Sequence, residues 1–173
     1  GSREAAKPHP LMVEYGIDAI PMQHQNLDIW RQNFKGVSYV DPKTNFLLFG
    51  AVDDLWRDNK SGETIVVDYK ATSKSSEVTI DADWQISYKR QMEFYQWLLR
   101  NNELDVSDTG YFVYCNGRRD LDQFDGKLEF VIKVIPYTGS DKWVDDTLQE
   151  ILDTLESDEI PQLNPNCDYC KYV

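Results

Sequence analysis

The run Ile65-Val66-Val67, followed directly by Asp68-Tyr69-Lys70, restricts the fold of this chain more than any other segment. Three consecutive β-branched apolar residues favour a strand that is buried on both faces. Alternate residues of a strand lie on the same face. We therefore expect the Asp68 carboxylate and the Lys70 ammonium to lie side by side at the end of a core strand.

Changes in periodicity along the chain predict strands on both sides of a central helix. The predicted strands are 37–40, an apolar segment at 46–56, 63–70, 110–115 and 128–135. The predicted helices are 27–34, 82–101, with Trp84, Tyr88, Gln91, Tyr95 and Leu98 on one face, and a last helix from a Ser140 cap to 157. This order predicts a single mixed α/β (α+β) domain with a central mixed β-sheet flanked by helices.

The composition excludes several classes of protein. A chain of 173 residues with 41% hydrophobic side chains can bury the core of one domain, which disfavours intrinsic disorder. It contains no apolar run near the ~18 residues that a membrane span needs. The net charge of −12 argues against coating nucleic acid through bulk positive charge, but not against an enzyme that holds a phosphodiester through metal ions. Three cysteines disfavour a disulfide scaffold and fit a reducing compartment such as the cytoplasm.

The turn before the buried strand determines which acidic residues face each other. If residues 59–62 form a four-residue loop, Asp53 lies opposite Asp68, with Cβ atoms about 5 Å apart. Asp54 then lies opposite Val67 and points to the other side of the sheet. Two carboxylates this close repel each other unless a cation lies between them, so we expect a divalent metal ion. The alternative is a surface hairpin with solvated charges, against which the position of Asp68 after an apolar run argues.

A glutamine within the apolar stripe of the central helix adds independent support. Gln91 faces the core in this interpretation, and a buried amide needs polar partners. A core glutamine satisfied by a neighbouring carbonyl is the alternative. Tyr95 follows one helical turn later, on the same face.

Three motifs in this order, Gly50-x-x-Asp53, Asp68-x-Lys70 and Gln91-x-x-x-Tyr95, resemble those of the PD-(D/E)XK nuclease superfamily. The similarity is greatest to the RecB-like branch, which includes CRISPR adaptation exonucleases and AddB-type helicase-nucleases. It covers roughly the middle third of the chain and implies a restriction-endonuclease-like core.

The resemblance also implies roles for these residues. Asp53, Asp68 and the main-chain carbonyl of Tyr69 would bind Mg²⁺ or Mn²⁺, and Lys70 would orient or activate the attacking water. Gln91 and Tyr95 would support the site and contact the nucleic-acid strand. The implied function is metal-dependent hydrolysis of DNA phosphodiester bonds by an exonuclease acting on single-stranded ends, in DNA repair or CRISPR adaptation.

The chain departs from the branch in its N-terminal part. Members usually carry a further His or Glu ligand on a helix before the Gly-x-x-Asp strand. Only His9 and His24 are available here, and we assign neither; a ligand upstream of residue 1 is the alternative. Gly1-Ser2 resembles a cloning remnant, so we expect residues 3–166 to be an N-terminally truncated nuclease-like domain.

Residues 167–173 form a tail that contains Cys167-x-x-Cys170. Related nucleases often close a 4Fe–4S cluster with cysteines from both ends of the domain. Because such a cluster needs four thiolates, we expect it in an intact protein and not in this chain.

Two other functions remain open at this point. A catalytically inactive nuclease fold could serve as a protein-interaction or DNA-mimic module, which the charge of −12 suits. A metal-binding hydrolase of small phosphate compounds is the other. We expect Trp30, Trp84, Trp97 and Trp143 to pack in the core or a groove rather than to stack on bases.

Overall fold

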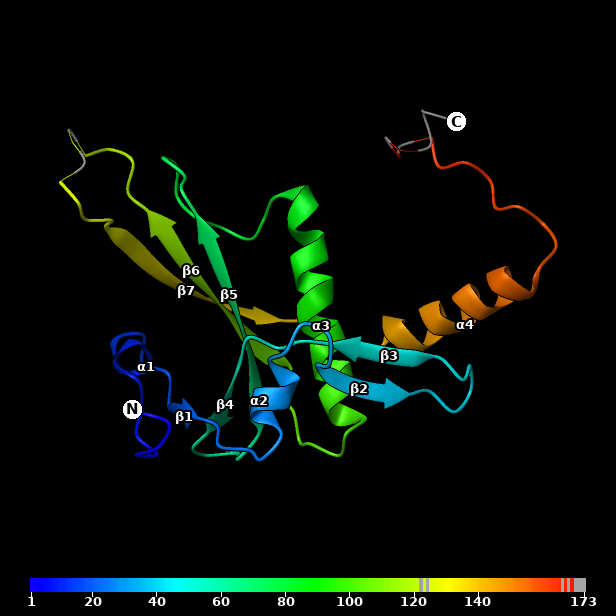
Figure 1. The fold of residues 1–173 in the computed structure, drawn as a ribbon, viewed down its shortest axis with the longest axis horizontal. Helices are drawn as coiled ribbons and strands as arrows, with labels where there is room; N and C mark the ends of the chain where they lie inside the picture. The colour runs from blue at the N-terminus through cyan, green and yellow to red at the C-terminus, as the bar shows by residue number, and fades with distance from the viewer. Residues whose placement is uncertain (122, 124, 166, 168, 170–173) are drawn as a thin grey trace.

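A computed structural model describes residues 1–121, 123, 125–165, 167 and 169. Within these residues, five strands form a mixed sheet in the order β1-β4-β5-β6-β7, and β2 and β3 form a separate antiparallel pair (Figure 1). The strands are β1 (Ala19–Pro21), β2 (Val37–Val40), β3 (Leu47–Gly50), β4 (Asp54–Asp58), β5 (Thr64–Thr72), β6 (Thr109–Gly117) and β7 (Phe130–Thr138). The helices are α1 (Pro10–Glu14), α2 (Leu27–Trp30), α3 (Ile86–Arg100) and α4 (Trp143–Glu156), with a 3-10 turn η1 (Asp83–Gln85) before α3.

Strand β5 lies at the centre of the sheet. It pairs antiparallel with β4 and parallel with β6, and α3 makes the crossover between β5 and β6 (Figure 1). Val66 belongs to the larger apolar cluster, which also contains Met92 and Leu98 of α3. Ile65 and Val67 belong to the cluster on the other face. The prediction of a mixed sheet flanked by helices, with a central strand buried on both faces, is confirmed.

The apolar segment 46–56 is two strands rather than one. Its first part, β3, pairs with β2, and its second part, β4, pairs with β1 and β5. Between them, the Val52 N–H donates to the Trp30 carbonyl at 3.1 Å, and the Val52 side chain is buried. Helix α2 therefore holds the chain where it passes from one sheet to the other.

Several predicted helix boundaries are wrong. Helix α2 ends at Trp30, and Phe34 is 97% exposed rather than on a buried face. Helix α4 begins at Trp143, with Lys142 rather than Ser140 at its N-cap. In the part of the chain that the structure describes, no helix has the length and apolar character needed to cross a membrane.

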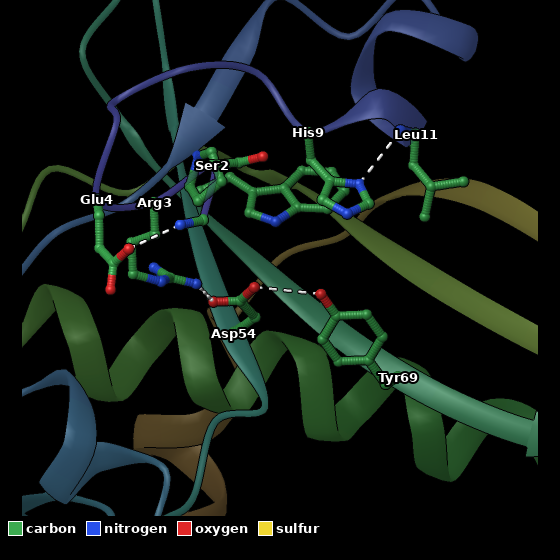
Figure 2. A pocket seen from close by; sticks show the side chains of 10 residues that line it. Ser2, Arg3, Glu4, His9, Leu11, Asp54 and Tyr69 are labelled. Carbon is green, nitrogen blue, oxygen red and sulfur yellow. Dashed lines mark hydrogen bonds and ion pairs between the residues drawn. The ribbon is translucent and has the colours of Figure 1, made fainter.

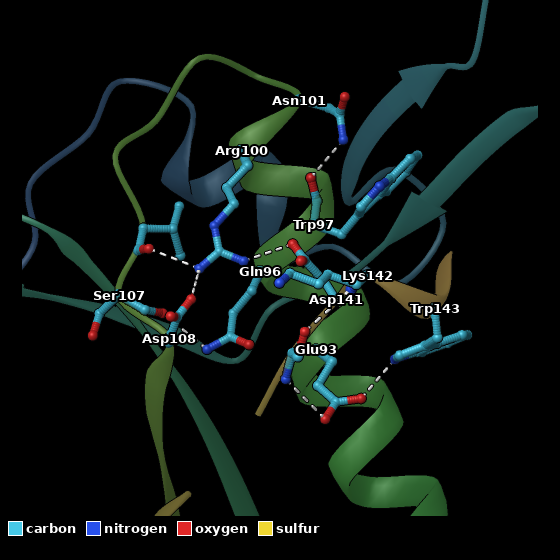
Figure 3. Close-up of polar contacts among 12 residues, drawn as sticks. Glu93, Gln96, Trp97, Arg100, Asn101, Ser107, Asp108, Asp141, Lys142 and Trp143 are labelled. Carbon is cyan, nitrogen blue, oxygen red and sulfur yellow. Dashed lines mark hydrogen bonds and ion pairs between the residues drawn. The ribbon is translucent and has the colours of Figure 1, made fainter. Parts of the chain in front are cut away.

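Glu93, on α3, connects the helix to the end of the sheet and to α4. It is 8% exposed and accepts a hydrogen bond from the Tyr137 hydroxyl at 2.6 Å. It also accepts a hydrogen bond from the Trp143 Nε1–H at 2.7 Å (Figure 3). Burial and the Glu93 carboxylate raise the pKa of Tyr137 to about 12. Gln96 and Arg100 follow at intervals of one helical turn along α3, and both donate hydrogen bonds to the segment that leads into β6. Arg100 also forms an ion pair with Asp141 at 2.6 Å. The polar contacts of Glu93, Gln96 and Arg100 therefore hold α3 against the sheet and α4.

We predict that Glu93→Ala lowers the free energy of unfolding by about 1–3 kcal/mol, because it leaves two partly buried donors, the Tyr137 hydroxyl and the Trp143 Nε1–H, without their acceptor. Urea denaturation followed by circular dichroism measures the loss. Glu150→Ala, on the exposed face of α4, is the matched control and should change stability by less than about 0.5 kcal/mol. Equal losses in the two variants would contradict the assigned role of Glu93.

Candidate active site

The β4–β5 hairpin brings two acidic residues together. The pairs Asp54–Val67 and Leu55–Val66 confirm the register predicted from a loop at 59–62. Asp53 lies one residue before β4, and its Oδ2 accepts a hydrogen bond from the Tyr69 N–H at 2.8 Å. Asp53 thus stands next to Asp68, at the point where β5 continues beyond the end of β4.

Asp68 is a carboxylate in a nearly closed environment. It is 3% exposed and continues the buried run of β5. Burial raises the pKa of Asp68; the nearby charge of Asp53 raises it further, while Lys70 acts in the opposite direction. A buried acid with a raised pKa next to a second acid is more typical of a functional site than of a structural position.

Lys70 lies against this carboxylate on the same face of β5. Its Nζ is 2.6 Å from Asp68 Oδ2 and donates to Gln91 Oε1 at 3.1 Å. The same Nζ lies 4.4 Å from the centre of the Tyr88 ring, a cation–π distance. Tyr88 precedes Gln91 by one helical turn, so the helical spacing alone could have identified it as a neighbour of the site. The ammonium is held from three directions.

Gln91 and Tyr95 extend this arrangement into the core. Gln91 Nε2 donates to the Tyr95 hydroxyl at 2.9 Å, and burial raises the pKa of that phenol. The Tyr95 ring packs so closely on Gly50 that a Cβ built on Gly50 would lie 2.6 Å from Tyr95 Cε1. Gly50 therefore provides the space that Tyr95 needs. The three predicted motifs meet in one continuous set of contacts.

The donor atoms at this site suit a hydrated divalent cation. Asp68 Oδ2 is buried and accepts no hydrogen bond of good geometry, although Lys70 Nζ is close to it. In an antiparallel pair, the N–H and C=O of one residue point to the same side. The Tyr69 carbonyl therefore lies on the side of Asp53, which accepts the Tyr69 N–H. Two carboxylates and one carbonyl are hard oxygen donors, which Mg²⁺ and Mn²⁺ prefer.

An open hollow of about 250 Å³ lies beside these donors, lined by Arg31, Val52, Asp53 and Tyr69. Its volume exceeds that of several water molecules, so water and part of a substrate can reach Asp53. Arg31, just after α2, places a positive charge at this hollow; its place in the site was not predicted, because nothing in the local sequence marks it.

No third side chain joins the two carboxylates in the described part of the chain. Among those residues, no group of three or more His, Cys, Asp or Glu side chains could hold a metal ion. His9 caps α1, and His24 stacks on Trp30 with ring centres 4.3 Å apart.

Asp54 belongs to a different environment, on the opposite face of the sheet. It pairs with Arg3 and accepts a hydrogen bond from the Tyr69 hydroxyl at 3.1 Å (Figure 2). These side chains line a pocket of about 460 Å³ next to the N-terminal segment. Burial, together with the Asp54 charge, raises the pKa of the Tyr69 hydroxyl. The predicted separation of Asp53 from Asp54 is confirmed.

Two of the three cysteines, Cys115 and Cys167, lie in the part of the chain that the structure describes. Cys115 lies in β6 and is partly buried, as expected for a packing residue. Cys167 lies near the C-terminus, and Cys170 is outside the described residues. With three cysteines in all, the chain cannot supply the four thiolates of a 4Fe–4S cluster.

The mixed sheet, with two acids from adjoining strands and a lysine two residues further on, has the architecture of restriction-endonuclease-like hydrolases. The chain belongs to the PD-(D/E)XK nuclease superfamily, whose family model matches residues 4–173. No curated protein and no solved structure matches the chain significantly. The predicted superfamily is confirmed, whereas the RecB-like branch stays a prediction.

We predict that Mn²⁺ stabilises the protein through Asp53 and not through Asp54. At a concentration 100-fold above Kd, binding adds about 2.7 kcal/mol and should raise Tm by roughly 7 °C. Asp53→Asn should lose this shift, while Asp54→Asn, the adjacent carboxylate on the other face, should retain it. Differential scanning fluorimetry with and without Mn²⁺ measures both. A shift that persists in Asp53→Asn would exclude this residue as a ligand.

We also predict that Gly50 and Tyr95 are energetically coupled. Gly50→Ala should cost about 1–3 kcal/mol of unfolding free energy, because the added methyl group meets the Tyr95 ring. In a Tyr95→Ala background, the same substitution should cost much less. A double-mutant cycle from urea denaturation gives the coupling energy. Additive losses would show that the close contact is relieved elsewhere.

Proposed function

We propose that this protein hydrolyses phosphodiester bonds of DNA, with Mg²⁺ or Mn²⁺ held by Asp53, Asp68 and the main-chain carbonyl of Tyr69. The observation that carries the proposal is the meeting of two carboxylates from adjoining strands beside Lys70. Membership of a nuclease superfamily, whose members typically use divalent cations, supports it. The overall charge of −12 fits this mechanism, because the substrate's phosphates would meet the cation and local basic groups.

The buried oxygen of Asp68 is the strongest sign that the donors fit a cation. Without a cation, the Asp68 carboxylate has the Lys70 ammonium beside it, while burial and the neighbouring Asp53 charge both raise the pKa of Asp68. When bound, the cation supplies a Lewis acid that polarises the phosphoryl oxygen and lowers the pKa of coordinated water. Asp53 and Asp68 determine where that charge is placed relative to Lys70.

Lys70 contributes a positive charge whose position is fixed. Its side chain is 17% exposed, and Asp68 and Gln91 hold its ammonium. From there it can donate a hydrogen bond to the attacking water or to the phosphate, where negative charge develops. We assign Lys70 as a catalytic residue on this basis.

Gln91 and Tyr95 act as positioning residues in this proposal. The Gln91 carbonyl oxygen accepts from Lys70, and its amide donates to the Tyr95 hydroxyl, so the amide orientation and the ammonium position are coupled. The resemblance to the superfamily motifs supports contact of the same pair with the nucleic-acid strand.

The resemblance to the RecB-like branch supports a more specific proposal: an exonuclease that acts on single-stranded ends, in DNA repair or CRISPR adaptation. A 4Fe–4S cluster would belong to a longer protein of this kind, in which Cys167 and Cys170 meet two further cysteines. The catalytic proposal does not depend on the cluster.

We predict that Lys70→Ala lowers cleavage of single-stranded DNA in Mn²⁺ by at least about 100-fold without unfolding the protein. Release of labelled nucleotides measures the rate, and circular dichroism checks the fold. Lys60→Ala removes an exposed lysine at the far turn of the same hairpin and should keep full activity. Full activity of Lys70→Ala would exclude its catalytic role. Absence of both cleavage and Mn²⁺ binding in the parent would instead favour the inactive-module function.

A further inference from the structure

An aromatic side chain beside the candidate site is exposed although it was expected to pack. Trp84, in η1, is 56% exposed. Its ring lies edge-to-face against Tyr88, with centres 5.4 Å apart, and Tyr88 in turn lies under the Lys70 ammonium. An unbroken row of contacts thus leads from the proposed catalytic lysine to an indole open to solvent.

The backbone that carries Trp84 is firmly held. The next residue, Gln85, is 1% exposed; its Oε1 accepts from the Ala82 N–H at 3.0 Å and its Nε2 donates to the Thr79 carbonyl at 2.8 Å. Val78 and Ile80 are buried in the main core cluster. An exposed aromatic ring on an anchored turn presents a pre-ordered surface, which lowers the entropy cost of binding.

Positive charge continues the row beyond the indole. Lys74 Nζ lies 5.3 Å from the centre of the Trp84 ring. Lys74, Arg118 and Arg119 then line a hollow of about 290 Å³ at the ends of β5 and β6, together with Glu77 and Asp120. Arg118 is ion-paired with Asp120 and Glu129, so Lys74 and Arg119 are the basic groups of this hollow that we assign to the nucleic-acid backbone. Two carboxylates, Asp81 and Asp83, are exposed in the segment that carries Trp84. These acids disfavour phosphate next to the indole but do not hinder an uncharged ring.

We propose that Trp84, supported edge-on by Tyr88, forms a stacking platform for an unpaired base of a single-stranded nucleic acid, whose backbone passes from the candidate site toward Lys74. Bases stack on exposed aromatic rings while basic groups follow the backbone, a combination typical of single-strand binding. In a duplex the bases are already stacked and paired, so they cannot lie on the indole. This inference rests on the proposed nuclease function and adds to it a binding subsite outside the metal donors.

The test measures binding apart from cleavage. Fluorescence anisotropy of a labelled oligothymidylate, titrated with protein in EDTA, gives Kd without turnover. Trp84→Ala should weaken binding roughly tenfold or more, whereas Trp84→Phe should recover most of the affinity. Phe34→Ala, which removes the most exposed aromatic ring among the described residues, is the control and should bind like the parent. Because Trp84 is exposed, equal melting temperatures should accompany these changes.

Three results would overturn the platform: parental affinity in Trp84→Ala, no binding of the oligothymidylate by the parent, or equal affinity of the parent for a duplex of the same length. Cleavage assays of the same variants in Mn²⁺ separate the two proposals. If Trp84→Ala raises KM and leaves kcat unchanged, the platform is supported. A parent that binds the single strand through Trp84 but does not cleave it would contradict the nuclease function alone.

Discussion

The burial of one carboxylate, Asp68, is the constraint on which the candidate site depends. Strand β5 carries it directly from a core that is apolar on both faces, where an isolated charge is strongly disfavoured. The Lys70 ammonium partly offsets the cost of burying the Asp68 charge, whereas the neighbouring Asp53 carboxylate adds to that cost. Such an arrangement is costly for stability alone. A cation held by Asp53 and Asp68, as proposed, would offset this cost.

Contacts outside the carboxylate pair explain why the three motifs include Gly50, Gln91 and Tyr95, which are not proposed metal ligands. Because Gly50 has no side chain, the Tyr95 ring can pack against it. The Tyr95 hydroxyl accepts a hydrogen bond from the Gln91 amide, and the Gln91 carbonyl oxygen accepts one from Lys70. Each step is a direct contact between elements that pack together in any case. The motif therefore describes one packed unit, and its glycine is as specific a requirement as its acids.

Much of this arrangement follows from the sequence, because it is local. A strand period of two and a four-residue turn are enough to place Asp53 opposite Asp68 and to exclude Asp54. What could not be predicted depends on tertiary contacts. The chain crosses between the two sheets at Val52, where its N–H bonds to the Trp30 carbonyl, a contact with a distant segment.

The position of Trp84 shows the same limit in another form. Its spacing from Tyr88 fits an α-helix, but the chain makes a 3-10 turn there, with three residues per turn, so the indole rotates away from the core. Arg31 reaches the site from a segment whose packing is set by the sheet crossing. Local spacing predicts which residues belong to a helix, but not whether its first turn has α or 3-10 geometry.

All the side chains proposed to act in catalysis lie between residues 50 and 95, in the β4–β5 hairpin, the strand end before it and the helix after it. Strands β6 and β7 and helix α4 brace this unit from outside. Insertions between β6 and β7, or after α4, would leave its internal geometry intact, so the same catalytic segment can be combined with very different surroundings.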